Sequence, residues 1–177
     1  MKLANTQPVK TIIVLAMHGT PPQDFPRPEL GEFFALHSRL EQGGEAEKGG
    51  VLARFKLLED KVRNWPRTPQ NDPFHAFSQE LAGELASAGE YEVITGYNEF
   101  CAPDIPRALE QAVERGAERI VVVTPMMTRG GEHAEIEIPA LIRRFRLLHP
   151  EIEVTYAWPF EKAEIAAFLN RHLKLFL

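Results

Sequence analysis

The amino-acid sequence predicts a three-layer α/β fold, in which a parallel sheet of four or slightly more strands lies between helices. Residues 11–17 form a continuous apolar run rich in β-branched side chains, and residues 119–124 (RIVVVT) give the clearest strand pattern in the chain. Such runs are typical of strands that are buried on both faces of a parallel sheet. Segments with helical spacing of apolar residues alternate with the strand-like segments. This alternation favours parallel strands joined by right-handed crossovers.

The remaining elements follow in chain order. Residues 91–97 contain Val93, Ile94 and Thr95 and are predicted to form the second strand. Residues 152–157 alternate apolar and polar side chains, which predicts a fourth strand and is compatible with an edge position. Apolar residues recur every three or four positions in the predicted helices, which span residues 74–88, 104–116, 133–148 and 162–175.

The segment between the first strand and the first of these helices breaks the alternation. After a proline-rich turn, residues 29–40 and 51–64 are candidate helices, separated by the polar, glycine-rich residues 42–50. Such a stretch is too long for an ordinary connection. We therefore interpret residues 21–72 as a loop and helical insertion in a single domain that spans residues 1–177. The insertion either covers the upper edge of the sheet or is a surface excursion without a role.

The composition limits the classes of function. The net charge of −5 gives no overall basic character that would favour nucleic acid. The single cysteine, Cys101, excludes an intramolecular disulfide and a cysteine-rich metal site, and we interpret it as structural. The apolar run at residues 11–17 is too short for export or membrane spanning. We therefore expect a cytoplasmic protein that binds neither nucleic acid nor membrane.

Two histidines follow predicted strands. His18 comes directly after the first strand, and His133 follows the third strand after a short loop. In open α/β sheets, ligands bind beyond the carboxyl ends of the strands, where two imidazoles can bind a divalent metal or exchange protons. One histidine alone is more often structural, but two at equivalent strand ends favour function. Glu99 follows the second strand and is either a third ligand, a proton acceptor or a solvated acid.

The loop that precedes His133 contains further candidates. Gly130 and Gly131 allow close backbone approach to a ligand at a helix N-terminus, although an ordinary turn is the alternative. Arg129 is a candidate for binding a substrate carboxylate, unless it is only a solvated charge. Glu137 lies one helical turn after His133 and can orient its imidazole. Neither a phosphate loop nor a dinucleotide-binding motif occurs, so we expect no organic cofactor.

These motifs resemble those of the CbiX-type sirohydrochlorin cobaltochelatases, which are class II chelatases. The matching segments are residues 13–20 (IVLAMHGT), 98–109 (NEFCAPDIPRAL), 116–139 (GAERIVVVTPMMTRGGEHAEIEIP) and 149–154 (HPEIEV). The resemblance implies a chelatase-like fold and the two active-site histidines of the family at His18 and His133, with its acid at Glu99. It also implies a homodimer, because short members of the family pair in this way.

The resemblance implies insertion of a divalent metal substrate into a tetrapyrrole such as sirohydrochlorin, in cobalamin or related tetrapyrrole biosynthesis. Co²⁺ is the metal expected first, with Ni²⁺ or Fe²⁺ as alternatives. Our hypothesis is that His18 and His133 hold the incoming metal while Glu99 assists as ligand or proton acceptor. Such a site has to stay open, because the metal leaves with the product.

Two features depart from the family pattern. His18-Gly19 is followed by Thr20-Pro21-Pro22, where the family often has serine and then arginine, and the insertion is longer than expected. Two other functions therefore stay open: a metal or tetrapyrrole carrier without turnover, and a nickel or iron chelatase on the same scaffold. A nucleotide-binding protein is disfavoured by the missing phosphate motifs.

Overall fold

The structure is a computed structural model that describes residues 9–42 and 50–177. Residues 1–8 and most of the predicted polar segment 42–50 lie outside the described residues. The strands are β1 (Thr11–Met17), β2 (Glu92–Tyr97), β3 (Arg119–Val123) and β4 (Glu153–Tyr156). All neighbouring strands pair in parallel, in the order β2-β1-β3-β4. The predicted fold class is thus confirmed, with β4 at an edge.

The predicted helices are also present, with ends that shift by a few residues. They are α1 (Arg27–Glu41), α2 (Val51–Arg63), α3 (Pro73–Gly89), α4 (Ile105–Glu114), α5 (Ile138–Leu148) and α6 (Lys162–Leu173). A short π-helix, η2 (His133–Glu137), precedes α5, so the predicted helix 133–148 begins in a different geometry from the one expected.

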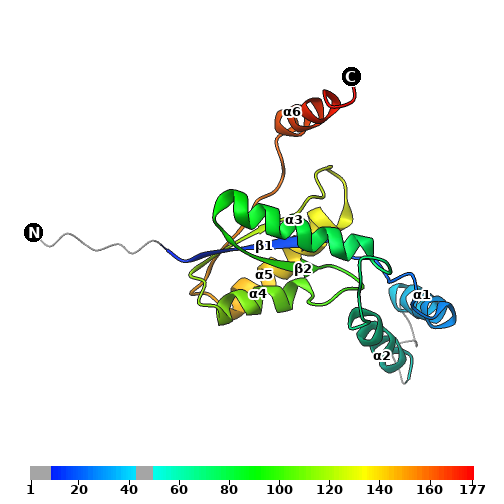
Figure 1. Cartoon of the computed structure of the whole chain (residues 1–177). Helices are drawn as coiled ribbons and strands as arrows, with labels where there is room; N and C mark the ends of the chain where they lie inside the picture. The colour runs from blue at the N-terminus through cyan, green and yellow to red at the C-terminus, as the bar shows by residue number, and fades with distance from the viewer. Residues whose placement is uncertain (1–8, 43–49) are drawn as a thin grey trace, which may run out of the picture.

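The central strand β1 packs against helices on both sides. Ile12 and Val14 belong to a buried cluster with α4 and α5, whereas Leu15 and Met17 belong to a cluster with α3. This division follows from the alternation of side chains along a strand. The sheet therefore lies between α3 on one face and α4 with α5 on the other (Figure 1). The carboxyl ends of all four strands point toward the same edge.

The helices α1 and α2 lie beyond that edge, within the predicted insertion 21–72 (Figure 1). They form an antiparallel hairpin with its own apolar cluster, to which Phe33, Leu58 and Val62 contribute buried side chains. Phe100, from the loop after β2, is part of the same cluster and is 9% exposed. The hairpin is therefore packed onto a loop at the carboxyl edge of the sheet.

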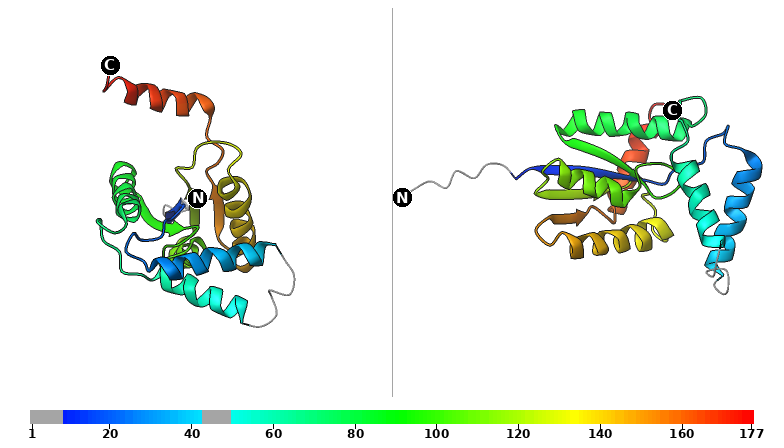
Figure 2. Two further views of the ribbon diagram at one scale, coloured as in Figure 1. Left: turned by 90° about the vertical axis from the view of Figure 1, so that its right-hand side faces the viewer. Right: turned by 90° about the horizontal axis from the view of Figure 1, so that it is seen from below.

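The last helix, α6, stands away from the sheet (Figures 1 and 2). None of its residues is buried, and Phe168, Leu169 and Leu173 are each about half exposed. The sheet itself has an open apolar groove of about 350 Å³ beside α3, which Ile13, Val121 and other residues line. Both the helix and this part of the sheet thus present apolar side chains to solvent. Within the described residues, no helix combines the length and apolar character needed to cross a membrane.

Candidate metal centre

The three residues predicted as metal ligands converge at the carboxyl edge of the sheet. His18 follows β1, Glu99 lies in the loop after β2, and His133 is the first residue of η2. One ligand atom from each residue can be chosen so that all three lie within 4.8 Å of one another. Nε2 of His18 is 3.7 Å from Oε2 of Glu99, and the two imidazole rings meet edge to face with centroids 4.5 Å apart.

The centre is open to solvent. The exposed fraction of the side chain is 42% for His18, 33% for Glu99 and 23% for His133. Two imidazoles and one carboxylate are borderline ligands that suit several divalent first-row metals. With three protein ligands at most, such a centre leaves coordination positions free for water or a second molecule. The arrangement can hold a metal ion and can also release it.

A carboxylate and an amide orient the imidazole of His133. Oε2 of Glu137 lies 2.7 Å from Nδ1 of His133, and the amide of Asn98 donates to the same carboxylate oxygen. If Nδ1–H donates to Glu137, the lone pair on Nε2 of His133 remains available to a metal. Partial burial acts to raise the pKa of Glu137, but the hydrogen bonds from His133 and Asn98 outweigh it and hold this pKa below its ordinary value.

The π-helical turn η2 begins at His133. The N–H of Ile138 donates to the carbonyl of His133, five residues earlier. Pro139 follows and has no N–H, so it cannot complete the ordinary α-helical hydrogen bond one turn back. Such wide turns occur frequently at functional sites. The proline of the Glu137-Ile138-Pro139 motif therefore gives a physical reason for the local geometry that carries His133 and Glu137.

His18 is fixed by the backbone of its own loop. Its Nδ1 lies 2.6 Å from the carbonyl oxygen of Gly19, so that nitrogen can donate its proton there and leave Nε2 toward Glu99. Gly19 has a φ of +98°, and a Cβ at this position would lie 1.9 Å from the carbonyl oxygen of Glu99. Only glycine permits this close approach of the two loops that carry His18 and Glu99.

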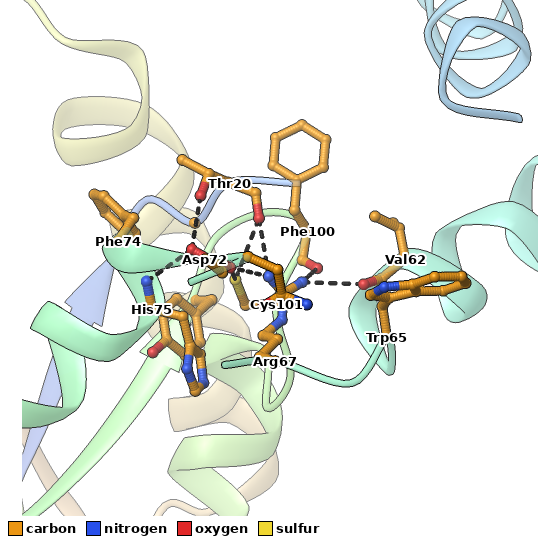
Figure 3. Close-up of polar contacts among 12 residues, drawn as sticks. Thr20, Val62, Trp65, Arg67, Asp72, Phe74, His75, Phe100 and Cys101 are labelled. Carbon is orange, nitrogen blue, oxygen red and sulfur yellow. Dashed lines mark hydrogen bonds and ion pairs between the residues drawn. The ribbon is translucent and has the colours of Figure 1, made fainter. Parts of the chain in front are cut away.

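A buried ion pair from the insertion ties the same two loops together (Figure 3). The guanidinium of Arg67 pairs with Asp72 and donates to the carbonyls of Thr20, Val62 and Phe100. Asp72 also accepts a hydrogen bond from the hydroxyl of Thr20. The side chains of Arg67 and Asp72 are 7% and 0% exposed. Thr20 lies in the loop of His18 and Phe100 in the loop of Glu99, so one arginine connects both.

Cys101 lies beside this ion pair. Its thiol is buried, and it contacts the carbonyl of Thr20 at 3.7 Å. Burial raises the pKa of the Cys101 thiol, which disfavours the thiolate form that binds metals. The environment agrees with the interpretation of Cys101 as a structural residue.

A cleft of about 230 Å³ lies between the candidate metal centre and the α1–α2 hairpin. Its residues come from the hairpin, from the loop after β2 and from η2; they are Phe33, Phe34, His37, Phe55, Glu59, Arg63, Asn98, Glu99, Phe100 and Glu137. Glu99 thus belongs both to the centre and to the wall of the cleft. The aromatic side of the cleft was not predicted from the sequence.

The other predicted binding residues lie elsewhere. Arg129 forms an ion pair with Glu135, and its side chain is 68% exposed. Gly130 has a positive φ of 87°, and the carbonyl of Gly131 accepts a hydrogen bond from the N–H of Glu135. None of these three residues lines the cleft. Their geometry is that of an exposed turn before η2, and a role in ligand binding stays a prediction.

The fold and this edge of the sheet define a class of protein: a parallel α/β protein with an open centre of two imidazoles and one carboxylate. Residues 67–174 match the CbiX family, and the chain belongs to that family. The family predicted from the motifs is thus confirmed. His18 and the α1–α2 hairpin precede the matched residues, so their relation to the centre is given by the structure.

Curated relatives match part of the chain. A segment is 38% identical over 71 residues to the sirohydrochlorin cobaltochelatase of Methanocaldococcus jannaschii, covering 37% of this chain and 49% of that protein. Another match, 36% identical over 62 residues, is to the sirohydrochlorin ferrochelatase of Priestia megaterium and covers 35% of this chain and 23% of that protein. The chain therefore spans less than half the length of these relatives.

The fold is similar to that of a solved structure. The CbiX protein of Marinobacter aquaeolei VT8, named for cobalamin (vitamin B12) biosynthesis, superposes with a TM-score of 0.52 at 18% sequence identity. The superposition covers 95% of this chain and 93% of that one. At this identity the likeness shows the fold alone, and it confirms the predicted chelatase-like architecture.

Proposed function

We propose that this protein inserts a divalent metal into a tetrapyrrole such as sirohydrochlorin, as the names of its curated relatives indicate for those proteins. The observation that carries the proposal is the convergence of His18, Glu99 and His133 on one open edge, with ligand atoms within 4.8 Å of one another. Co²⁺ is the metal expected first, and Fe²⁺ or Ni²⁺ are alternatives, because imidazole and carboxylate ligands bind all three.

Metal insertion requires that the ion lose water and that the ring lose two pyrrole protons. The imidazoles of His18 and His133 would replace water on the incoming ion through their Nε2 lone pairs, since their Nδ1 atoms face Gly19 and Glu137. A neutral imidazole cannot accept a proton on the same nitrogen while it binds a metal. Glu99, which is partly exposed, is therefore the group assigned to accept the two ring protons one after the other and to pass each to solvent.

The test is a metallation assay with purified protein, sirohydrochlorin and each of Co²⁺, Fe²⁺ and Ni²⁺, followed by absorbance. We expect His18→Ala, His133→Ala and Glu99→Gln each to reduce the rate about 100-fold or more, the scale of a lost acid–base contact. The control is His172→Ala, on the exposed helix α6. Near-normal rates in all three site variants would contradict the assignment. Stoichiometric ring binding without metallation would instead identify a carrier.

We further propose that the protein is a homodimer in which α6 of one copy covers the open groove on the sheet of the other. The supporting observation is that two apolar surfaces of one chain are both uncovered: the half-exposed side chains of Phe168 and Leu169 and the groove beside Val121. Burial of both would remove apolar area from water. The expectations of a cytoplasmic location and of no nucleic-acid or membrane partner stay predictions.

A further inference from the structure

We propose that the aromatic face of the α1–α2 hairpin is the wall on which the flat, conjugated ring of the substrate packs while its metal is inserted. This inference rests on the proposed function and adds the role of the insertion to it. The hairpin spans residues 27–63, whereas the match to the CbiX family begins at residue 67. The wall therefore lies outside the residues that match the family.

The wall consists of packed aromatic side chains, of which Phe34 is the one largely exposed to solvent. Phe33 stacks on Phe55 with ring centroids 5.0 Å apart and lies 5.8 Å from Phe100. Phe33 and Phe100 are 7% and 9% exposed, so they are held by the hairpin core. Phe34 contacts both of them, with centroid distances of 5.5 and 5.9 Å, yet it is 47% exposed. Phe34 thus lines the cleft with much of its ring uncovered.

The position of this wall beside the candidate metal centre is the reason for assigning the substrate ring to it. Phe34 and Glu99 line the same cleft, which has a volume of about 230 Å³. Pockets that enclose a drug-sized ligand are generally larger, roughly 300–1,000 Å³. The cleft therefore admits part of a large ring and leaves the remainder outside. A flat ring packed on Phe34 would lie beside Glu99, the member of the centre that also lines the cleft.

The aromatic side of the cleft, rather than its carboxylates Glu59, Glu99 and Glu137, is suited to recognition of a ring face. Arg63 is the arginine that lines the cleft, and its guanidinium is already engaged by Glu59 and by the carbonyls of Asn98 and Cys101. The same contacts fix the C-terminal end of α2 to the loop that carries Glu99. Aromatic side chains bind flat conjugated surfaces by offset stacking, independently of the charge at the ring edge. The aromatic wall is thus apolar, and these contacts hold it in place before a ligand binds.

The experiment compares Phe34→Ala with Phe77→Ala, because Phe77 is a 59% exposed phenylalanine on α3 that does not line the cleft. Metal-free sirohydrochlorin is titrated into each protein by absorbance, and Co²⁺ is titrated separately. We expect Phe34→Ala to weaken ring binding about five- to tenfold, the scale of one aromatic contact. Its affinity for Co²⁺ should equal that of the unaltered protein. Phe34→Trp should retain ring binding, and Phe77→Ala should match the unaltered protein.

The possible outcomes distinguish a failure of the proposed wall from a failure of the proposed function. If Phe34→Ala binds the ring with unchanged affinity, the proposed role of the wall is wrong, whereas the proposed metal insertion is unaffected. A parallel loss of Co²⁺ binding also overturns it, since the substitution would then act on the whole centre. If the unaltered protein neither binds nor metallates sirohydrochlorin, both the wall and the proposed function fail.

Discussion

The groups that contact Nδ1 bear on which imidazole nitrogens of the candidate centre are free to bind a metal; for His133 they are Glu137 and the amide of Asn98. Glu137 lies against Nδ1 of His133, and the carbonyl of Gly19 lies against Nδ1 of His18. Each contact leaves the Nε2 lone pair available if Nδ1 carries the proton. The two partners differ in kind, because one is a charged side chain that can be removed and the other is a backbone group that cannot. Glu137 is therefore the residue at which this control can be tested.

We expect Glu137→Ala to weaken Co²⁺ binding roughly 10- to 100-fold, as is usual when the partner of a ligating histidine is removed. The imidazole of His133 would lose the acceptor that fixes its proton on Nδ1. The measurement is a titration of Co²⁺ alone into metal-free protein. Glu135→Ala is the matched control, because Glu135 belongs to the same turn but pairs with Arg129. Equal affinities in both variants would contradict the role given to Glu137.

The sequence predicted some of these residues and not others, for physical reasons. His18, Glu99 and His133 were predictable because parallel strands end at one edge, so residues that follow them converge. Asn98 was missed although it directly precedes Glu99, because its contact with Glu137 depends on how two loops face each other. Arg129 looked available in the sequence, and the structure pairs it with a nearby carboxylate.

At the scale of elements, the insertion is joined to the sheet edge by the buried pair of Arg67 and Asp72. Arg67 belongs to no periodic pattern, because it lies between two prolines in a segment where no helix or strand was predicted. Its contacts run to Thr20 and Phe100, which are far away in sequence. Helical spacing predicted α1 and α2 well, since that signal is local. The way they attach to the sheet depends on distant partners and could not be predicted from spacing.

We expect Arg67→Ala to lower the free energy of unfolding by about 3–5 kcal/mol, because it leaves the fully buried carboxylate of Asp72 without its cation. Urea unfolding followed by circular dichroism measures this change. Arg54→Ala provides the control: it breaks an ion pair with Glu32 that is partly exposed, so its effect should be much smaller.

The double variant Arg67→Met with Asp72→Leu should recover part of the lost stability, since no unpaired buried charge remains. A loss for Arg67→Ala no larger than that for Arg54→Ala would show that the buried pair does not stabilise the junction.

At the scale of the whole molecule, the sheet is covered unevenly. Ile120 and Val122 of β3 are fully buried under α4 and α5, whereas Val121 and Val123 on the opposite face are only half-buried. The periodicity of residues 162–175 correctly predicted an amphipathic helix, α6, but periodicity does not say which surface receives its apolar side. In this structure that side faces solvent.

We expect light scattering after size-exclusion chromatography to give the mass of a dimer, and Phe168→Asp to shift it toward the monomer by placing a charge in the apolar contact. Phe77→Asp, on α3, is the control for adding a charge to an exposed phenylalanine. A monomer at every concentration of the unaltered protein would contradict the proposal.

The combination Val121→Cys with Leu169→Cys distinguishes exchange of α6 between copies from its return to its own sheet. The native Cys101 is buried, so the introduced thiols are the ones free to react. A disulfide between chains, seen as a doubled mass on a non-reducing gel, supports exchange. A disulfide within one chain would show that α6 folds back.

The central place of β1 in the sheet has a consequence for the order in which the protein folds. Ile12 pairs with Glu92 on one side, and Thr11 pairs with Arg119 on the other. The strand that comes first in the chain therefore cannot enter the sheet until much later segments have been made, and closing such long loops is slow. The α1–α2 hairpin needs only neighbouring residues and can form early. Its attachment to Phe100, and the meeting of His18 with Glu99 and His133, must wait for the sheet, so the candidate centre is among the last features to assemble.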